Sequence, residues 1–388
     1  MAVLPTTAIS TASTFFSEAT DLTFRNRPML AWLDHGGRIV RDQKGKDANW
    51  LVQYRKKQAG TYTRFQDFEF SDEEFYKAMS VTHVWLAGHS GMDITQTVEN
   101  DGDTAIVREY LTRMSKCVDS LQVTLSRSLY ADSSLAANAG LFTGIGSFMK
   151  ALTTCTTNDL IAQPGTTYAG QPTNLGYYGG SWSSDIPSGQ RPSTQLGNDW
   201  PDGHGLTEIE YDWNAPRLYN ENTSKWGGTT ATWRDNCLNM LSRANVDILM
   251  NSSEAILPTM HTTGSTRMAQ MKSKLRENVR EILPHQDSKD IGYAGETINF
   301  EGSVVALDHE CPADRTYSLN LNGMLAYFMG TPDQTKVISG GDMVTGGIFF
   351  GFGPERVSGS GKIAWVVWCG GNVRYVPKYF GCHKDWTV

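Results

Sequence analysis

The chain has 388 residues, of which 39% are hydrophobic and 19% charged, and its net charge is −7. This length and apolar content predict a folded protein with a large core and exclude a disordered chain. The acidic balance argues against wholesale nucleic-acid binding, because duplex binders concentrate Lys and Arg to neutralise phosphates. Aromatic residues make up 11%, including 11 Trp, and this composition favours a surface that meets partners.

The six cysteines are scattered, and no two of them have Cys-x-x-Cys spacing. We therefore expect no disulfide framework and no zinc site, and we expect reduced thiols in a cytoplasmic product. No apolar run is long enough to span a membrane, and the N-terminus lacks the basic start and apolar core of a signal peptide. We expect no cofactor and no membrane association.

The N-terminal residues 1–23 are rich in Ser and Thr and carry no Lys or Arg. They include Phe15 and Phe16 but no sustained hydrophobic period. This predicts an extended arm that is ordered only where it lies on another surface. A short helix or turn is predicted over 26–33, because Pro28 stands near its start and glycines follow its end.

Residues 38–70 alternate in the manner of strands, with one run at 50–54 and a second at 62–69 around a turn at 58–60. The pattern predicts a long β-hairpin over 48–70. The tip is basic, and five residues are candidates for contact with a neighbouring molecule: Arg55, Lys56, Lys57, Tyr62 and Arg64. A lone hairpin is only marginally stable in water, and this one lacks an evident core face, so we expect it to project and rest on a neighbour. An ordinary hairpin in the subunit's own sheet is the alternative.

A strand is predicted over 78–86, and the clearest helix follows over 103–131. Asp101 and Asp103 suit its N-terminus, where negative charge is favourable. Apolar residues recur at helical spacing along one side, at Val107, Tyr110, Met114, Val118, Leu121, Leu125 and Leu129. Such a helix spans about 43 Å at ~1.5 Å per residue and would serve as a girder across a flat subunit.

The remaining chain predicts a mixture of helices and strands. Gly, Ser, Thr, Trp and Tyr are frequent over 140–230, so loops with short strands are expected there. Helices are predicted over 233–244, 251–257 and 266–283, and strands over 247–250, 297–307 (a pair around Glu301-Gly302), 316–328, 364–368 and 373–376. No internal repeat is visible.

The search for chemical motifs leaves no catalytic constellation. Gly88-His-Ser-Gly91 lacks the second glycine spacing of a nucleophile elbow, so a turn between strand and helix is expected there. The glycines of 140–146 have neither phosphate-loop nor dinucleotide spacing and are expected to form a bend after the long helix.

Two other sets of residues contain side chains of the types found in metal sites or acid–base pairs. His309 and Cys311, with Cys382 and His383, match no closed metal site, so polar loop residues are expected. Asp308 and Glu310 would share a face in a strand and could form an acid–base pair, but no substrate motif accompanies them. We therefore expect no catalytic residue and no metal.

The order of elements resembles the Hong Kong 97-like fold of the major capsid proteins of tailed bacteriophages. Three stretches carry the resemblance: Gly36-Gly-Arg-Ile-Val40; Trp233-Arg-Asp-Asn236 through Val246 to Glu254; and Ile298 to Asp308 followed by Cys311 to Leu319. The resemblance implies an α+β fold with an N-terminal arm (1–34), an extended β-hairpin loop (35–77), a peripheral domain (78–140, spine helix 103–131), an axial domain (141–335, with a Gly/Trp-rich insertion near 165–230) and C-terminal strands returning to the core (336–388).

The resemblance implies a major capsid protein that assembles into hexamers and pentamers of an icosahedral shell around double-stranded DNA, without sequence-specific binding. No charged helical segment like the fused scaffold of some relatives is present, so a separate scaffolding protein is expected, with a portal and optional decoration proteins. We expect no covalent crosslink, assembly in the host cytoplasm, and final location in the virion. The alternatives are an encapsulin-like nanocompartment shell and, more remotely, a virion-associated hydrolase.

Overall fold

The computed structural model describes residues 27–54, 64, 76–93, 103–150, 160–161, 166–173, 213–221, 226, 232–251, 258–277, 297–329, 344–346, 349–357 and 362–385. In parts of these stretches only the backbone is described, as in the first half of the long helix and in the strands between 344 and 365. The described part contains both helices and sheets, which confirms the α+β class.

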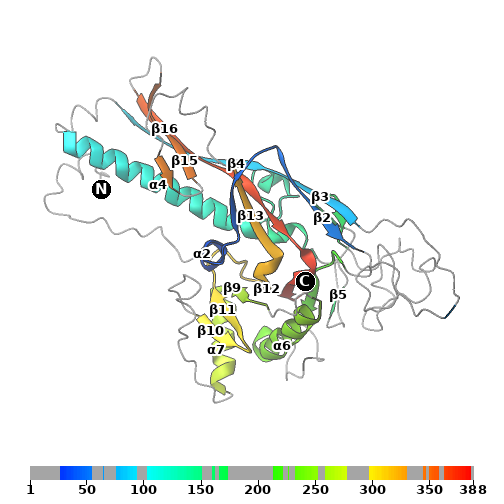
Figure 1. The fold of residues 1–388 in the computed structure, drawn as a ribbon. Helices are drawn as coiled ribbons and strands as arrows, with labels where there is room; N and C mark the ends of the chain where they lie inside the picture. Colours follow the sequence, from blue (N-terminus) through cyan, green and yellow to red (C-terminus); the bar gives the residue numbers. More distant parts are fainter. Residues whose placement is uncertain are drawn as a thin grey trace.

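A six-stranded sheet forms the upper part of the molecule in Figure 1. Its strands are β1 (Ile39–Gln43), β4 (Val84–Asp93), β13 (Met324–Met329), β14 (Val344–Gly346), β15 (Phe349–Val357) and β16 (Lys362–Tyr375). The 14-residue strand β16 is central, since β4 pairs along one edge while β15 and then β13 pair along the other. Strand β16 therefore joins β15, its neighbour in the chain, to β4 and β13, which are far from it in the sequence.

Helix α4 (Asp103–Tyr130) lies along this sheet, as Figure 1 shows, and confirms the helix predicted over 103–131. Its buried side chains Cys117, Leu121, Leu125 and Leu129 recur every four residues and face the core. Gly88 of β4 allows the close approach: a Cβ there would lie 3.2 Å from both the Cys117 carbonyl oxygen and Leu121 Cγ. The stripe seen in the sequence is thus the face that packs on the strands.

A seven-stranded sheet of order β10-β11-β9-β12-β17-β8-β5 forms the lower part. Its strands are β5 (Leu160–Ile161), β8 (Arg217–Asn220), β9 (Met260–Thr263), β10 (Thr297–Phe300), β11 (Ser303–Leu307), β12 (Arg315–Leu319) and β17 (Phe380–Lys384). Helices α6 (Trp233–Asn251) and α7 (Ser265–Glu277) pack on each other and against β8, β10 and β11 in one apolar cluster. A larger cluster fills the space between the two sheets and α4.

One short helix and two hairpins lie outside the two large sheets in the described part of the chain. Helix α2 (Pro28–His35), at the start of the described chain, buries Met29, Trp32 and Leu33 in the larger cluster. The two remaining sheets are hairpins, β2 (Asp47–Gln53) with β3 (Tyr76–Thr82) and β6 (Thr167–Tyr168) with β7 (Gln171–Pro172). The pair β10–β11 turns at Glu301-Gly302 with φ of 50° and 84°, which confirms the strand pair predicted over 297–307.

The predicted pairing of the large hairpin is wrong. Strand β2 pairs over its whole length with β3, which begins at Tyr76. The second strand of the predicted hairpin, 62–69, lies outside the described residues apart from Arg64. The register places Trp50 opposite Met79 and Ala48 opposite Val81, and all four side chains are buried. The apolar residues of 78–82 therefore supply the core face that the 62–69 run lacks, and the predicted loop boundary at residue 77 falls inside β3.

Glycines misled two further predictions. Gly88–Gly91 is not a turn but part of β4, where Gly88 makes room for α4. The predicted strands 364–368 and 373–376 are one strand, β16. Gly370 and Gly371 do not interrupt it, because a Cβ on Gly370 would lie 2.6 Å from the Trp85 ring and one on Gly371 would lie 2.2 Å from Tyr327 O.

The strand predicted over 247–250 is wrong, because α6 continues to Asn251. Ile248 is fully buried and extends the apolar stripe of Leu241 and Ala244 by one turn. The helix predicted over 251–257 lies almost entirely outside the described residues. The helix predicted over 266–283 is α7, described as far as Glu277, and the run 316–328 is divided by a 3₁₀ turn into β12 and β13.

Candidate functional site

The β2–β3 hairpin has one buried and one exposed face. Its inner face packs on the body through Trp50, Met79 and Val81. On its outer face, Leu51 is 68% exposed and Tyr76 is 54% exposed. Leu51 pairs with Ala78, so Tyr76 is its diagonal neighbour on the same face. Two large apolar side chains therefore stand together at the outer face of the hairpin.

Of the predicted contact residues, the structure describes Arg64, which is an exposed turn residue. The candidates Arg55, Lys56, Lys57 and Tyr62, and Phe15 and Phe16 of the arm, lie outside the described residues. What the structure adds is the outer face formed by Leu51 and Tyr76, which the sequence pattern did not single out because Leu51 lies on the face opposite to the apolar Trp50.

A small turn anchors the hairpin to the body. Ser80 N–H donates to Ala169 O at 3.2 Å, and Gln171 Nε2 donates to Ala78 O at 3.0 Å. The β6–β7 turn has positive φ at Ala169 (52°) and at Gly170 (81°). Gly170 adopts this conformation without strain, because it has no Cβ. Strand β3 is thus held on one edge by β2 and on the other by this turn.

The β6–β7 hairpin is itself hydrogen-bonded to strand β16. Tyr168 is buried, and its hydroxyl accepts a hydrogen bond from Tyr375 N–H at 2.9 Å. Its ring lies 5.1 Å from that of Phe148. Asn372 of β16 also donates to Thr82 O at 2.8 Å. The base of the hairpin is therefore joined to β16 by two independent routes.

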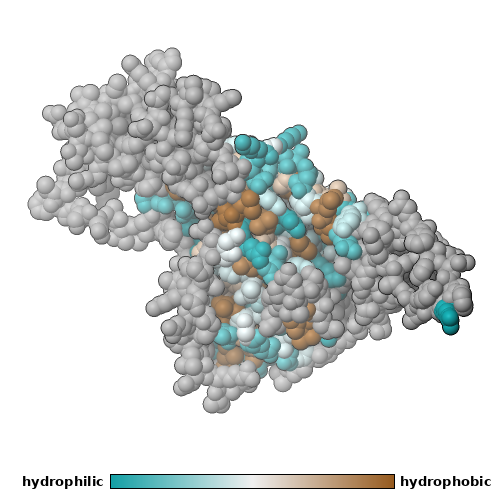
Figure 2. Space-filling model, in the orientation of Figure 1, coloured by the Kyte–Doolittle hydropathy of each residue, from teal (hydrophilic) through white to brown (hydrophobic). Residues whose placement is uncertain are grey.

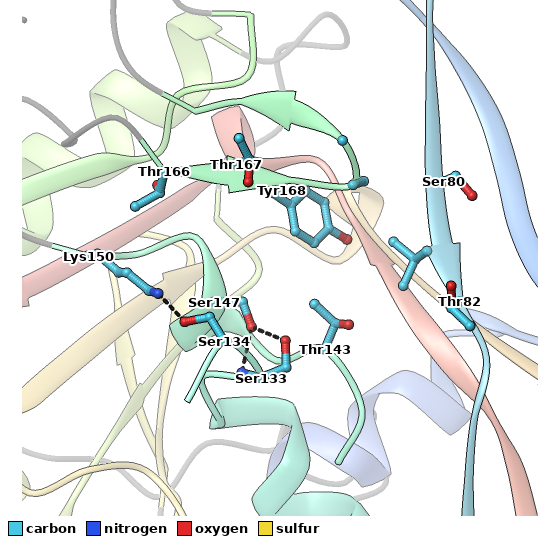
Figure 3. A pocket seen from close by; sticks show the side chains of 13 residues that line it. Ser80, Thr82, Ser133, Ser134, Thr143, Ser147, Lys150, Thr166, Thr167 and Tyr168 are labelled. Carbon is cyan, nitrogen blue, oxygen red and sulfur yellow. Dashed lines mark hydrogen bonds between the residues drawn. The ribbon is translucent and has the colours of Figure 1, made fainter. Parts of the chain in front are cut away.

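A cavity of about 490 Å³ lies beneath the base of the hairpin. Figure 3 shows that hydroxyl side chains line it from several elements. Its one cation, Lys150 Nζ, lies 3.0 Å from Asp132 Oδ2 and also donates to Ser134. The lining residues with polar side chains are Ser80, Thr82, Ser133, Ser134, Thr143, Ser147, Lys150, Thr166, Thr167 and Tyr168. With its lysine already paired, the cavity offers hydrogen bonds but no general base.

Asp308 joins three parts of the fold. It is fully buried, and its Oδ2 accepts a hydrogen bond from Tyr130 Oη at 2.8 Å, at the end of α4. Its carboxylate also accepts from the backbone N–H of Glu310, at 3.0 Å, and of Met29 in α2. Burial raises the pKa of Asp308 to about 6, although these hydrogen bonds oppose the shift. The pair Asp308–Glu310 therefore forms a turn that secures α2 and α4, and not an acid–base pair in a strand.

The four residues weighed as metal ligands are separated by their environments. His309 is exposed, whereas Cys311, Cys382 and His383 are buried. Burial raises the pKa of both thiols, that of Cys382 to about 12, which disfavours the thiolate that binds metal. Within the described residues, no three side chains of the ligand types are grouped to hold a metal ion.

None of the described helices is both long enough and apolar enough to cross a membrane. Figure 2 shows apolar (brown) and polar (teal) residues interspersed over the described part of one face.

Comparison with solved structures identifies the fold. The chain is similar to a chain of the cyanophage A-1(L) capsid asymmetric unit, with 14% identity and a TM-score of 0.57, over 97% of this chain and 98% of that one. The fold is that of tailed-phage capsid proteins. A capsid chain of the native GTA particle matches at 11% identity with a TM-score of 0.50, over 98% and 99% of the two chains.

An encapsulin complex from Synechococcus elongatus matches at 7% identity with a TM-score of 0.49, over 99% and 96% of the two chains. No protein-family model and no curated protein matches the sequence. The capsid fold thus extends over nearly the whole chain, and the expected resemblance is confirmed at the level of the fold.

Proposed function

We propose that the chain is the major capsid protein of a tailed bacteriophage, which assembles into the hexamers and pentamers of an icosahedral shell. The observation that supports this most directly is the capsid fold over 97% of the chain. The long α4 girder, the hairpin with an exposed apolar outer face and the arm before α2 are features that suit a shell subunit. The protein acts by assembly and not by catalysis.

The outer face of the hairpin is the first proposed contact. Leu51 and Tyr76 are exposed in the single subunit, and burying such side chains contributes roughly 25 cal/mol per Å² of apolar surface. A contact made by only two side chains is weak when a subunit makes it once. In a closed shell each subunit makes many such contacts, and their effective concentration makes the sum strong. The hairpin's attachment to β16 keeps this face in place for a neighbour.

The hairpin tip and the arm are the second and third proposed contacts. Arg55, Lys56, Lys57, Tyr62 and Arg64 would meet acidic groups of an adjacent subunit. Phe15 and Phe16 would place the arm on a neighbour's apolar surface. A protein of net charge −7 has ample acidic surface to receive the basic tip.

The remaining partners follow from the same proposal. The shell would enclose double-stranded DNA without sequence-specific contacts, because an acidic subunit does not neutralise phosphates. Assembly would require a separate scaffolding protein and a portal, with decoration proteins as optional additions. The subunits would assemble in the host cytoplasm and remain in the virion without covalent crosslinks.

The proposal is tested by expressing the chain with its candidate scaffolding protein and imaging the product by negative-stain electron microscopy. Closed shells are expected, and a soluble monomer under every assembly condition would overturn the proposal. Shells that hold cargo protein in place of nucleic acid would instead favour an encapsulin-like compartment. Hydrolytic activity of a monomer on a glycan would favour the virion-associated hydrolase.

The hairpin contact is tested by the double substitution Leu51→Asp and Tyr76→Asp. We expect normal folding, because both side chains are exposed, but a loss of shells of at least tenfold. The matched control is Val246→Asp, which places the same charge at another exposed apolar position, on α6. Undiminished assembly of the double variant would show that this face is not a subunit contact.

A further inference from the structure

Three polar side chains lie in a row inside the seven-stranded sheet: His261 of β9, Ser318 of β12 and His383 of β17. Each is 0% exposed. His261 Nδ1 lies 2.8 Å from Ser318 Oγ, and that oxygen lies 2.8 Å from His383 Nε2. Gly381 pairs with Ser318, and a Cβ there would lie 3.1 Å from the ring atom Cε2 of Tyr219. The row links three adjacent strands through side chains.

The neighbours of the row fix where its protons lie. Asn245 Nδ2 donates to Glu301 Oε2 at 3.4 Å, so Asn245 Oδ1 is the atom that faces His261 Nε2, at 3.1 Å. An amide oxygen only accepts, and therefore His261 carries its proton on Nε2. His261 Nδ1 is then an acceptor and receives the Ser318 hydroxyl proton. Ser318 Oγ in turn accepts from His383 Nε2–H, which leaves His383 Nδ1 without a proton.

This arrangement admits only neutral rings. A proton added to His261 Nδ1 would face the hydroxyl that now donates to it. A proton added to His383 Nδ1 would find no acceptor, because that buried atom has no hydrogen-bond partner among the described residues. Burying a donor or a charge without a partner is costly. Either protonation therefore leaves a buried donor without an acceptor: the Ser318 hydroxyl in the first case and His383 Nδ1–H in the second.

Among the described residues, neither ring has a carboxylate as its hydrogen-bond partner. His383 stacks on Tyr219 at 4.7 Å and lies 6.0 Å from Trp233. The titratable and charged groups that face the row from the packed elements are Tyr219 (β8), Glu221 after β8, Asp247 (α6), Arg267 (α7), Glu301 (β10–β11 turn) and Asp314 before β12. Arg267 is paired with Glu221 at 2.7 Å, and its positive charge opposes a second cation on His383.

We propose that His261, Ser318 and His383 form a proton-sensitive lock that holds β9, β12 and β17 to α6 at neutral pH and is weakened in mildly acid solution. Burial lowers the pKa of His261 to about 3. Burial, followed by the charges of His261 and Arg267, lowers the pKa of His383 well below its ordinary value. In the unfolded chain both rings titrate near ~6.5. The unfolded state thus binds more protons, and stability falls as the pH drops below about 6.5.

The lock is tested by urea unfolding of the full chain at pH values from 7.5 to 5. Each ring should raise the unfolding equilibrium constant by about tenfold per pH unit once the pH is below ~6.5. His383→Gln keeps a side-chain N–H donor toward Ser318 but cannot titrate. The unfolding equilibrium constant of this variant should therefore lack one of the two factors of about tenfold per pH unit. The control is His89→Gln, the same change at an exposed histidine of β4. A His383→Gln variant with the pH dependence of the unchanged protein would overturn the proposal.

A second measurement needs no variant to fold. Hydrogen–deuterium exchange of the unchanged protein, corrected for the intrinsic effect of pH, is compared at pH 7.5 and pH 5. Peptides that cover β9, β12, β17 and α6 should lose more protection than those that cover the C-terminal half of β16. Equal loss in both sheets, or none in either, would contradict the lock. The lock belongs to the subunit, so this outcome is independent of whether the chain builds a shell.

Discussion

The α4 girder and the seven-stranded sheet are held together by different kinds of contact. Helix α4 meets β4 through leucines and through Gly88, where backbone and side chain come within 3.2 Å of an added Cβ. The lower sheet instead carries buried polar groups at its centre, among them Arg267 at 5% exposure and the two histidines at 0%. Apolar packing tolerates changes of pH, whereas a buried polar layer depends on the charge of each member. One subunit therefore contains a part held mainly by apolar packing and a part that carries a buried polar layer.

The largest effect is expected from Arg267→Met in the polar layer. Arg267 pairs with Glu221 at 2.7 Å, donates to two backbone carbonyls and stacks on Trp233 at 4.6 Å. Its loss leaves a buried carboxylate without its partner, which costs about 3–5 kcal/mol. Urea unfolding measures the loss. The double variant with Glu221→Gln should regain part of it, and failure to do so would assign the effect to the lost stacking instead.

Leu125→Ala tests the apolar part. The side chain is 0% exposed within the α4 stripe, and its truncation should cost about 2–5 kcal/mol through lost burial and a cavity. The loss should be the same at pH 5 and pH 7.5, because the burial that is lost is apolar. A loss that changes by more than about 1 kcal/mol between these pH values would contradict the division between the two parts.

Tyr130→Phe cuts the hydrogen bond that connects the two parts. The hydroxyl donates to Asp308 Oδ2 at 2.8 Å, and removal of a hydrogen bond to a charged group costs about 1.5–3 kcal/mol. Since this hydrogen bond lowers the pKa of Asp308, the variant should also raise that pKa further. The free energy of unfolding at pH 7 measures the first effect, and its pH dependence measures the second. Leu135→Ala, an exposed change nearby, serves as the control and should alter neither.

Asp308 itself should give a pH dependence whose sign is opposite to that of the histidines. Burial raises its pKa from 3.8 to about 6, so the folded state binds more protons between these values. Its contribution to stability is complete below pH 3.8 and is lost as the pH rises through about 6, by at most ~1.4 kcal/mol per pH unit. Asp308→Asn should remove this slope in urea unfolding from pH 4 to pH 7. An unchanged slope would mean that another group carries it.

The sequence predicted correctly those elements that depend on nearby residues alone, such as α4 with its apolar spacing and the turn at Glu301-Gly302. The prediction failed where packing between distant segments decides the structure. Gly370 suggests a break in a strand, but it pairs with Trp85 of β4, whose ring occupies the space where a Cβ would lie. Strand β3 could be recognised as the partner of β2 only from the core face that Trp50 and Met79 share.

The candidate site was predicted less well than the fold. The basic hairpin tip and the arm are visible in the sequence, but they lie outside the described residues except for Arg64. The outer face of Leu51 and Tyr76 could not be recognised before the correct strand pairing was known. The row of His261, Ser318 and His383 gives no local signal, because its members lie 57 and 65 residues apart and meet only when β9, β12 and β17 pair.

The position of β17 in its sheet has a consequence for biosynthesis. This strand lies between β12 and β8, antiparallel to the first and parallel to the second, and it follows both in the chain. During translation, β8 and β12 leave the ribosome with the gap between them still empty. The sheet closes only when β17 arrives, since pairing of strands so far apart in sequence is slow. Until then the open edges of β12 and β8 are exposed to other chains, which makes this interval the one in which a chaperone has most to protect.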